Sequence, residues 1–142
     1  MIVHIDRAVL TTLAEHARGE FPRECCGVLF GRREGDRFEV RRVEAAANIT
    51  EGDPGRSFQV DWQALFRAVR VSRAGSDTLL GFYHSHPDGS DRPSPRDAAE
   101  AWEDHLYLIV PIQDGVARRP TAWFLRTSGA AFTRVDVTEE TG

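Results

Sequence analysis

The sequence predicts a mixed α/β (α+β) fold, with a single domain over residues 1–142 in which helices flank one curved mixed β-sheet. Apolar residues recur at helical spacing in some segments, and in others they alternate or run on over the length of a strand. Helical and strand-like segments are also interspersed along the chain, which favours helices packed on a sheet. A length of 142 residues suits one domain, and no repeat, linker or low-complexity segment divides the chain.

Seven strands are expected where apolar runs are bounded by turn-forming residues. They are residues 2–5, 27–32, 38–46, 78–86, 106–112, 121–126 and 131–137. The Glu-Gly-Asp sequence at 34–36 is typical of a hairpin turn, so the second and third strands should be antiparallel neighbours. The polar segments 48–56 and 88–93 are rich in Gly, Pro and Asp and are expected to form loops.

Three helices are expected between these strands. Asp6 should cap the first, whose apolar residues follow at helical spacing as far as Gly19. Asp61 should cap the second, which is amphipathic and ends near Gly75. A third and shorter helix should begin at Pro95, a residue type favoured at the first helical position.

Composition excludes several classes of protein. The 18 basic and 22 acidic residues give a net charge of −4, so a nucleic-acid partner is not expected. No apolar run approaches the roughly 18 residues that a membrane span needs, and the N-terminus lacks the apolar core of a signal peptide. Cys25 and Cys26 are adjacent, a poor geometry for a disulfide, so we expect reduced thiols and a cytoplasmic location.

Three residues of ligand type are spaced for a metal site. His84 and His86 are two apart near the end of an expected strand, so side-chain alternation places both imidazoles on one face. Asp97 follows in Ser-Pro-Arg-Asp, a helix-start pattern in which the helix dipole favours an ionised carboxylate. Zinc in hydrolases takes three such protein ligands and leaves one position open. Two histidines and a carboxylate also hold Fe(II) in oxygenases, so spacing alone leaves the metal open.

Three stretches of the chain resemble the JAMM or MPN+ family of zinc metalloproteases, in particular its small prokaryotic members. They are PRECCGVLFG at 22–31, GFYHSHP at 81–87 and PSPRD at 93–97, and the resemblance extends over nearly the whole chain. It implies the JAMM/MPN architecture, whose sheet is similar to that of cytidine deaminases. It also implies one Zn²⁺ held by His84, His86 and Asp97.

The same resemblance implies the roles of two further residues and the class of substrate. Glu24 would act as general base and then acid, and Ser94 would stabilise the oxyanion of the tetrahedral intermediate. The expected reaction is hydrolysis of the amide bond after the C-terminal Gly-Gly of a ubiquitin-like or sulfur-carrier protein. Only about eight residues separate Asp97 from the next expected strand, which favours a small substrate.

Other functions remain open from the sequence. A non-catalytic MPN-fold interaction module is the main alternative, because some relatives keep the fold without the ligands; the intact ligand set argues against it. A zinc deaminase would need His-x-Glu and Cys-x-x-Cys, which this chain lacks. A hydrolase using Cys25 or Cys26 with a histidine would survive chelation and be inactivated by thiol alkylation.

Overall fold

A computed structural model describes residues 1–48, 55, 63, 67, 70 and 77–140. Its strands are β1 (Ile2–Asp6), β2 (Cys26–Glu34), β3 (Arg37–Ala46), β4 (Thr78–His86), β5 (His105–Gln113), β6 (Val116–Ala117), β7 (Thr121–Leu125) and β8 (Thr133–Glu140). The helices named in the described part of the chain are α1 (Arg7–Glu20) and α3 (Pro95–Glu100).

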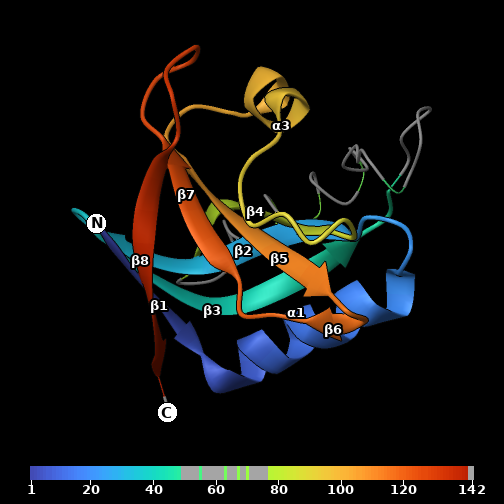
Figure 1. Cartoon of the computed structure of the whole chain (residues 1–142). Helices are drawn as coiled ribbons and strands as arrows, with labels where there is room; N and C mark the ends of the chain where they lie inside the picture. Colours follow the sequence, from blue (N-terminus) through green and yellow to red (C-terminus); the bar gives the residue numbers. More distant parts are fainter. Residues whose placement is uncertain (49–54, 56–62, 64–66, 68–69, 71–76, 141–142) are drawn as a thin grey trace.

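All eight strands join one mixed sheet in the order β4-β2-β3-β1-β8-β7-β5-β6. Strand β1 runs parallel to β3 and β8, and β4 runs parallel to β5, whereas the other pairings are antiparallel. Strand β4 therefore has hydrogen-bonded neighbours on both sides, β2 and β5. Figure 1 shows α1 beneath this sheet and α3 above it.

The predicted mixed α/β fold with a helix-flanked sheet is confirmed, with differences at individual elements. Strand β6 was not expected, because two residues are too short for a sequence pattern. The last strand begins at Thr133 rather than 131 and continues to Glu140. Asp6 does occupy the N-cap position of α1, but its side chain makes no capping hydrogen bond.

Some predictions lie outside what the structure describes. The second helix, expected from Asp61 to Gly75, and the loop 48–56 fall largely outside the described residues. That residues 1–142 form one domain, and that the sheet is similar to a cytidine deaminase's, stay predictions. In the described part of the chain, neither helix has the length and apolar composition needed to cross a bilayer.

Buried side chains form two clusters, one on each side of the sheet. The first contains the apolar face of α1, with Val9, Leu13 and Ala17 packed on β1, β3 and β5. The second consists of Val28, Phe30, Phe82, Tyr107, Ile109 and Trp123. Because side chains alternate along a strand, His84 and His86 share the face of Phe82 and lie on the side opposite α1.

A bulge in β4 determines which face the histidines occupy. Leu29 pairs with Gly81 and Phe30 pairs with Leu79, so Leu80 is an extra residue in β4. Leu80 packs in the first cluster and Phe82 in the second, although two residues apart would normally share a face. Regular alternation from Leu80 would place the histidines on the α1 side. The bulge thus directs them to the opposite face.

Gly81 should be among the glycines most sensitive to substitution. A Cβ atom at this position would lie 1.8 Å from the carbonyl oxygen of Leu106, which is backbone and cannot turn aside. We expect Gly81→Ala to lower the free energy of unfolding by roughly 3 kcal/mol or more, measured by urea denaturation. Gly19→Ala is the control, because nothing lies within 4 Å of a Cβ there and a helical Ala adds up to about 1 kcal/mol. Equal midpoints for wild type and Gly81→Ala would contradict the close approach.

Candidate metal centre

Glu24 is held beside the histidines by the pairing of the chain just before β2 with the end of β4. The backbone N–H of Cys25 donates to Ser85 Oγ at 2.8 Å, and the Ser85 N–H donates to the Cys25 carbonyl at 3.1 Å. This pairing places Glu24 Oε1 4.0 Å from His86 Nε2. The side-chain amide of Asn48 donates to the Glu24 carbonyl at 3.1 Å, which fixes the backbone from the other side.

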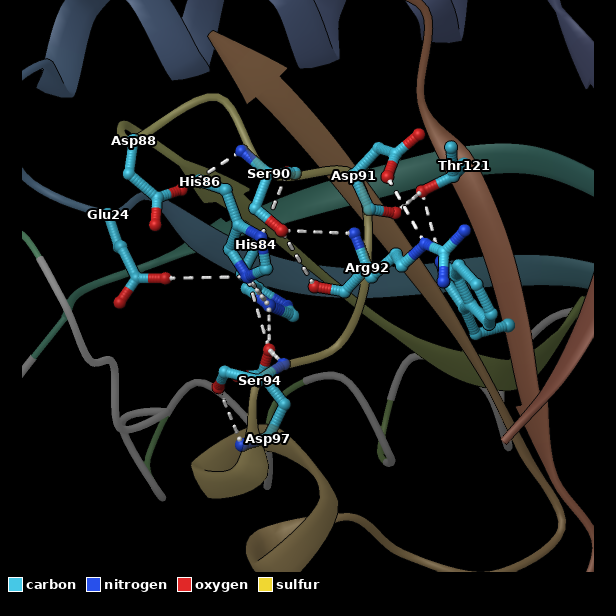
Figure 2. Close-up of polar contacts among 11 residues, drawn as sticks. Glu24, His84, His86, Asp88, Ser90, Asp91, Arg92, Ser94, Asp97 and Thr121 are labelled. Atoms are coloured by element: carbon cyan, nitrogen blue, oxygen red, sulfur yellow. Dashed lines mark hydrogen bonds and ion pairs between the residues drawn. The ribbon is translucent and has the colours of Figure 1, made fainter. Parts of the chain in front are cut away.

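Three ligand-type atoms converge above the end of β4. His84 Nε2 and His86 Nε2 lie 3.0 Å apart, and each lies 3.1 Å from Asp97 Oδ2. Figure 2 shows the two imidazoles turned toward Asp97, with Glu24 approaching from the side. The structure therefore brings together three residues that are 2 and 11 positions apart in the chain.

The tautomer of His86 is set by a backbone carbonyl. His86 Nδ1 lies 3.0 Å from the carbonyl oxygen of Ser90, in the loop that follows β4. A carbonyl only accepts, so Nδ1 carries a proton, and in the neutral imidazole this leaves the lone pair on Nε2, which faces Asp97 and His84. Metal-binding histidines commonly make this kind of hydrogen bond with their second nitrogen.

Asp97 is oriented by the first turn of α3. The Asp97 N–H donates to Ser94 Oγ at 3.1 Å, and the Ser94 N–H donates to Asp97 Oδ2 at 2.8 Å, which completes a capping box. The reciprocal bond turns the carboxylate back toward the loop and the histidines. The Ser-Pro-Arg-Asp pattern therefore starts the helix and also orients the Asp97 carboxylate toward the two histidines.

Burial and mutual contacts shift the pKa values of these groups. Burial opposes ionisation of Asp97, but hydrogen bonds with His84 and His86 outweigh it and hold the carboxyl pKa well below its usual range. Burial lowers the pKa of His84. Burial also opposes a charge on His86, yet its contact with Asp97 raises the pKa overall. An anionic Asp97 and a neutral His84 are the ligand forms that metals require.

Glu24 is nearly inaccessible, with 3% of its surface exposed. Burial raises the pKa of its carboxyl to about 8, and the nearby Asp97 adds to the effect, while His86 lowers it. In the described part of the chain, Glu24 Oε2 finds no hydrogen-bond donor. A buried carboxyl poised near neutrality beside two histidines has the properties of a general acid and base.

The donor set fits a metal ion. Lone pairs 3.0–3.1 Å apart repel unless a proton or cation lies between them. The three atoms are close enough together that one ion could be held by all of them at about 2.0–2.1 Å, the distance that zinc takes from nitrogen and oxygen ligands. Glu24, His84 and His86 also form a group with ligand atoms within 4.8 Å of one another. Asp97 is nearer to both imidazoles than Glu24 is, which favours Asp97 as the carboxylate ligand.

The two cysteines lie apart from this chemistry. Both are free and fully buried, and the Cys26 thiol is directed to the backbone carbonyls of Ala46 and Ala47. Burial raises the pKa of the Cys25 thiol to about 11 and that of Cys26 to about 12. The thiolate needed for nucleophilic attack is therefore scarce near neutral pH.

Thiol alkylation should leave the folded protein active. At pH 7.5 we expect iodoacetamide to modify neither cysteine appreciably, because the thiolate fraction is below about 0.1% and both side chains are inaccessible. A chelator should abolish activity under the same conditions. Mass spectrometry before and after denaturation measures the alkylation. Loss of activity on alkylation, with resistance to chelation, would instead favour the cysteine–histidine mechanism.

Sequence reasoning did not identify Ser85 or Ser90 as parts of this centre. Ser85 lies between the two histidines, and alternation places its side chain on the other face, toward Cys25. That orientation was available from the sequence, but the partner was not. Ser90 contributes a backbone carbonyl, which any residue type could supply, so no sequence signal marks it.

Comparison with known proteins identifies the family. The family described as prokaryotic homologs of the JAB domain matches residues 6–126. A probable TtuB-protein conjugate cleaving protease from Thermus thermophilus is 35% identical over 116 residues, or 82% of this chain and 74% of that protein. A CysO-cysteine peptidase from Mycobacterium bovis is 31% identical over 111 residues, or 75% of this chain and 70% of that protein.

The fold is also similar to that of a solved protein. A solution structure from Desulfitobacterium hafniense matches with a TM-score of 0.86 at 26% identity, covering 99% of this chain and 94% of that one. The chain belongs to the prokaryotic homologs of the JAB domain, and the enzyme class predicted from its sequence, a JAMM-type peptidase, is confirmed with the family.

Proposed function

We propose that the chain is a zinc-dependent peptidase or isopeptidase in which His84, His86 and Asp97 hold one Zn²⁺. The observation that carries the proposal is the triangle of Nε2, Nε2 and Oδ2 atoms, 3.0–3.1 Å apart, with the Glu24 carboxylate beside it. When bound there, zinc would supply a Lewis acid that polarises the substrate carbonyl and lowers the pKa of a water to about 7.

Glu24 would move the proton during hydrolysis. Its Oε1 lies 4.0 Å from His86 Nε2, so a water beside the histidines is within reach of the carboxylate. Burial and the absence of a donor to Oε2 among the described residues leave this carboxyl free to take a proton. The same group would then deliver the proton to the leaving amine, which needs it to depart.

Ser94 would donate a hydrogen bond to the developing oxyanion. Its Oγ is an acceptor in the capping box, from the Asp97 N–H, and this bond does not use the hydroxyl proton. Among the described residues, Ser94 Oγ donates no hydrogen bond. Helix capping and oxyanion stabilisation are therefore compatible in one serine, and the capping bond fixes the position of the oxygen.

The proposed substrate is a ubiquitin-like or sulfur-carrier protein cleaved after its C-terminal Gly-Gly. The names of the two relatives support this class and differ in what leaves: a TtuB-linked protein in one case, and cysteine in the other. The mechanism accepts both, because either leaving group is an amine freed from an amide. A membrane or nucleic-acid partner is not part of the proposal, and the free thiols support a reducing, cytoplasmic setting.

A substrate panel tests this function. The zinc-loaded protein is incubated with a ubiquitin-fold carrier whose Gly-Gly is extended by a single cysteine, by a short peptide, or by an isopeptide-linked protein. Mass spectrometry should find the carrier ending at Gly-Gly, and a chelator should prevent the cleavage. Metal analysis of the purified protein separates zinc from iron. Intact carriers in every arm, with zinc bound, would contradict the substrate class.

A further inference from the structure

Three consecutive backbone carbonyls in the loop after β4 each accept a hydrogen bond from a different strand. The Gly89 carbonyl accepts from Gln113 Nε2 of β5 at 3.0 Å. The Ser90 carbonyl accepts from His86 Nδ1 of β4 at 3.0 Å. The Asp91 carbonyl accepts from Thr121 Oγ1 of β7 at 2.6 Å. We refer to these three hydrogen bonds as the carbonyl clamp.

The clamp adds links to β5 and β7 to the local hydrogen bonds of this loop, in which the Gly89 N–H donates to the His86 carbonyl and the Ser90 N–H donates to Asp88 Oδ1, each at 3.0 Å. The next helix, α3, has no buried residue, so apolar packing of the helix itself does not position it. The loop must nevertheless place Ser90 against His86 and carry the chain on to Asp97. Figure 2 shows Thr121 reaching the loop from the side opposite Glu24. Hydrogen bonds to the neighbouring strands therefore position this loop, whereas α1 is positioned by its apolar face.

The Thr121 hydroxyl is itself oriented from the core. Trp123 Nε1 donates to Thr121 Oγ1 at 3.0 Å, which leaves the hydroxyl proton to donate to the Asp91 carbonyl. Trp123 is buried in the second cluster, which also contains Phe82 and Ile109. Consecutive hydrogen bonds of this kind strengthen one another. The hydrogen bonds from Trp123 to Thr121 and from Thr121 to the Asp91 carbonyl therefore link the loop to a buried part of the sheet.

We propose that Thr121, backed by Trp123, and Gln113 are positioning residues of the metal centre. They hold the carbonyls on either side of Ser90, and so fix the one carbonyl that sets the tautomer and ring orientation of His86. Neither side chain touches the proposed ligands. The inference rests on the proposed function, because it concerns the ligand set named there.

Thr121→Val tests the clamp, because valine keeps the shape of threonine and removes the hydroxyl. We expect the zinc affinity of Thr121→Val to fall about tenfold, measured by competition with a chromophoric chelator. Losses of this size are typical when a residue that supports a metal ligand without binding the metal is changed. Thr121→Ser keeps the hydroxyl and should restore the affinity to near the wild-type value. Gln113→Ala, at an exposed position, should lower it independently by several-fold.

Hydrogen exchange of the metal-free protein separates this inference from the proposed function. Peptides covering residues 88–97 should exchange faster in Thr121→Val than in wild type or Thr121→Ser, while α1 and β3 keep their protection. This result needs neither zinc nor substrate, so it stands even if no carrier is cleaved. Unchanged exchange over 88–97, or a zinc affinity in Thr121→Val equal to that of wild type, overturns the inference.

Discussion

The Glu24→Gln variant is expected to bind zinc and to lose peptidase activity by a factor of about 10²–10⁴. Glutamine keeps the shape of the side chain and its place beside His86, but it cannot take and return a proton. The ligand triangle of His84, His86 and Asp97 does not include Glu24, so metal content should remain at one ion per chain. The measurement is kcat/KM on a cleaved carrier, together with metal analysis of the same sample.

The same substitution should stabilise the metal-free protein, with a defined pH dependence. Burial raises the pKa of Glu24 from 4.5 to about 8, so between these values the folded protein holds a proton that the unfolded chain releases. Wild-type stability should therefore fall as pH rises through this window. Glutamine removes the effect, and the variant should exceed wild type by about 1–3 kcal/mol at pH 8. At pH 4 the free energies of unfolding of wild type and Glu24→Gln should converge.

Glu20→Gln is the matched control for both experiments. Glu20 lies four residues earlier, at the exposed end of α1. Its substitution should leave turnover unchanged and should keep the fall in stability that Glu24 produces between pH 5 and pH 8. Normal turnover in Glu24→Gln would remove Glu24 from the mechanism. A stability difference that does not grow between pH 5 and pH 8 would contradict the buried, protonated carboxyl.

Asp97→Asn should abolish tight metal binding. The amide oxygen of asparagine can still accept from the Ser94 N–H, so the start of α3 should persist. The charge that faces both Nε2 atoms at 3.1 Å is lost, however. We expect zinc affinity to fall by about 100-fold or more, which exceeds the usual loss when a residue that only supports a metal ligand is changed. Chelator competition measures the affinity, and turnover should fall with it.

Asp91→Asn controls for a general loss of negative charge in the loop. Its carboxylate is 47% exposed and faces Arg92 at 4.0 Å, away from the proposed ligands. The substitution keeps the backbone carbonyl that Thr121 contacts, so zinc affinity should remain within about twofold of wild type. If Asp91→Asn weakened binding as much as Asp97→Asn, electrostatic attraction rather than ligation would explain the effect.

Local sequence patterns were sufficient to predict much of the arrangement of the candidate site. A spacing of two in a strand puts His84 and His86 on one face wherever the strand begins, and Ser-Pro-Arg-Asp specifies a helix start wherever it lies. These features depend on neighbours within a few residues. The structure brings His84, His86 and Asp97 together because the strand alternation and the helix start are both present in the folded chain.

Long-range features could not be predicted in the same way. The face that the histidines occupy depends on the extra residue Leu80, and the only sequence sign of that bulge is Gly81 within an apolar strand. The place of Glu24 depends on Ser85, 60 residues from Cys25, so only the family resemblance indicated it. The path of the loop depends on Thr121, on a strand 30 residues later than Asp91.

Anomalous diffraction at the zinc edge, from crystals of the zinc-loaded protein, tests the central claim most directly. One peak is predicted within about 2.0–2.2 Å of His84 Nε2, His86 Nε2 and Asp97 Oδ2, with the Glu24 carboxylate outside the ligand set. A peak that takes Glu24 as its carboxylate ligand in place of Asp97, or crystals with no peak at these histidines, would contradict the account.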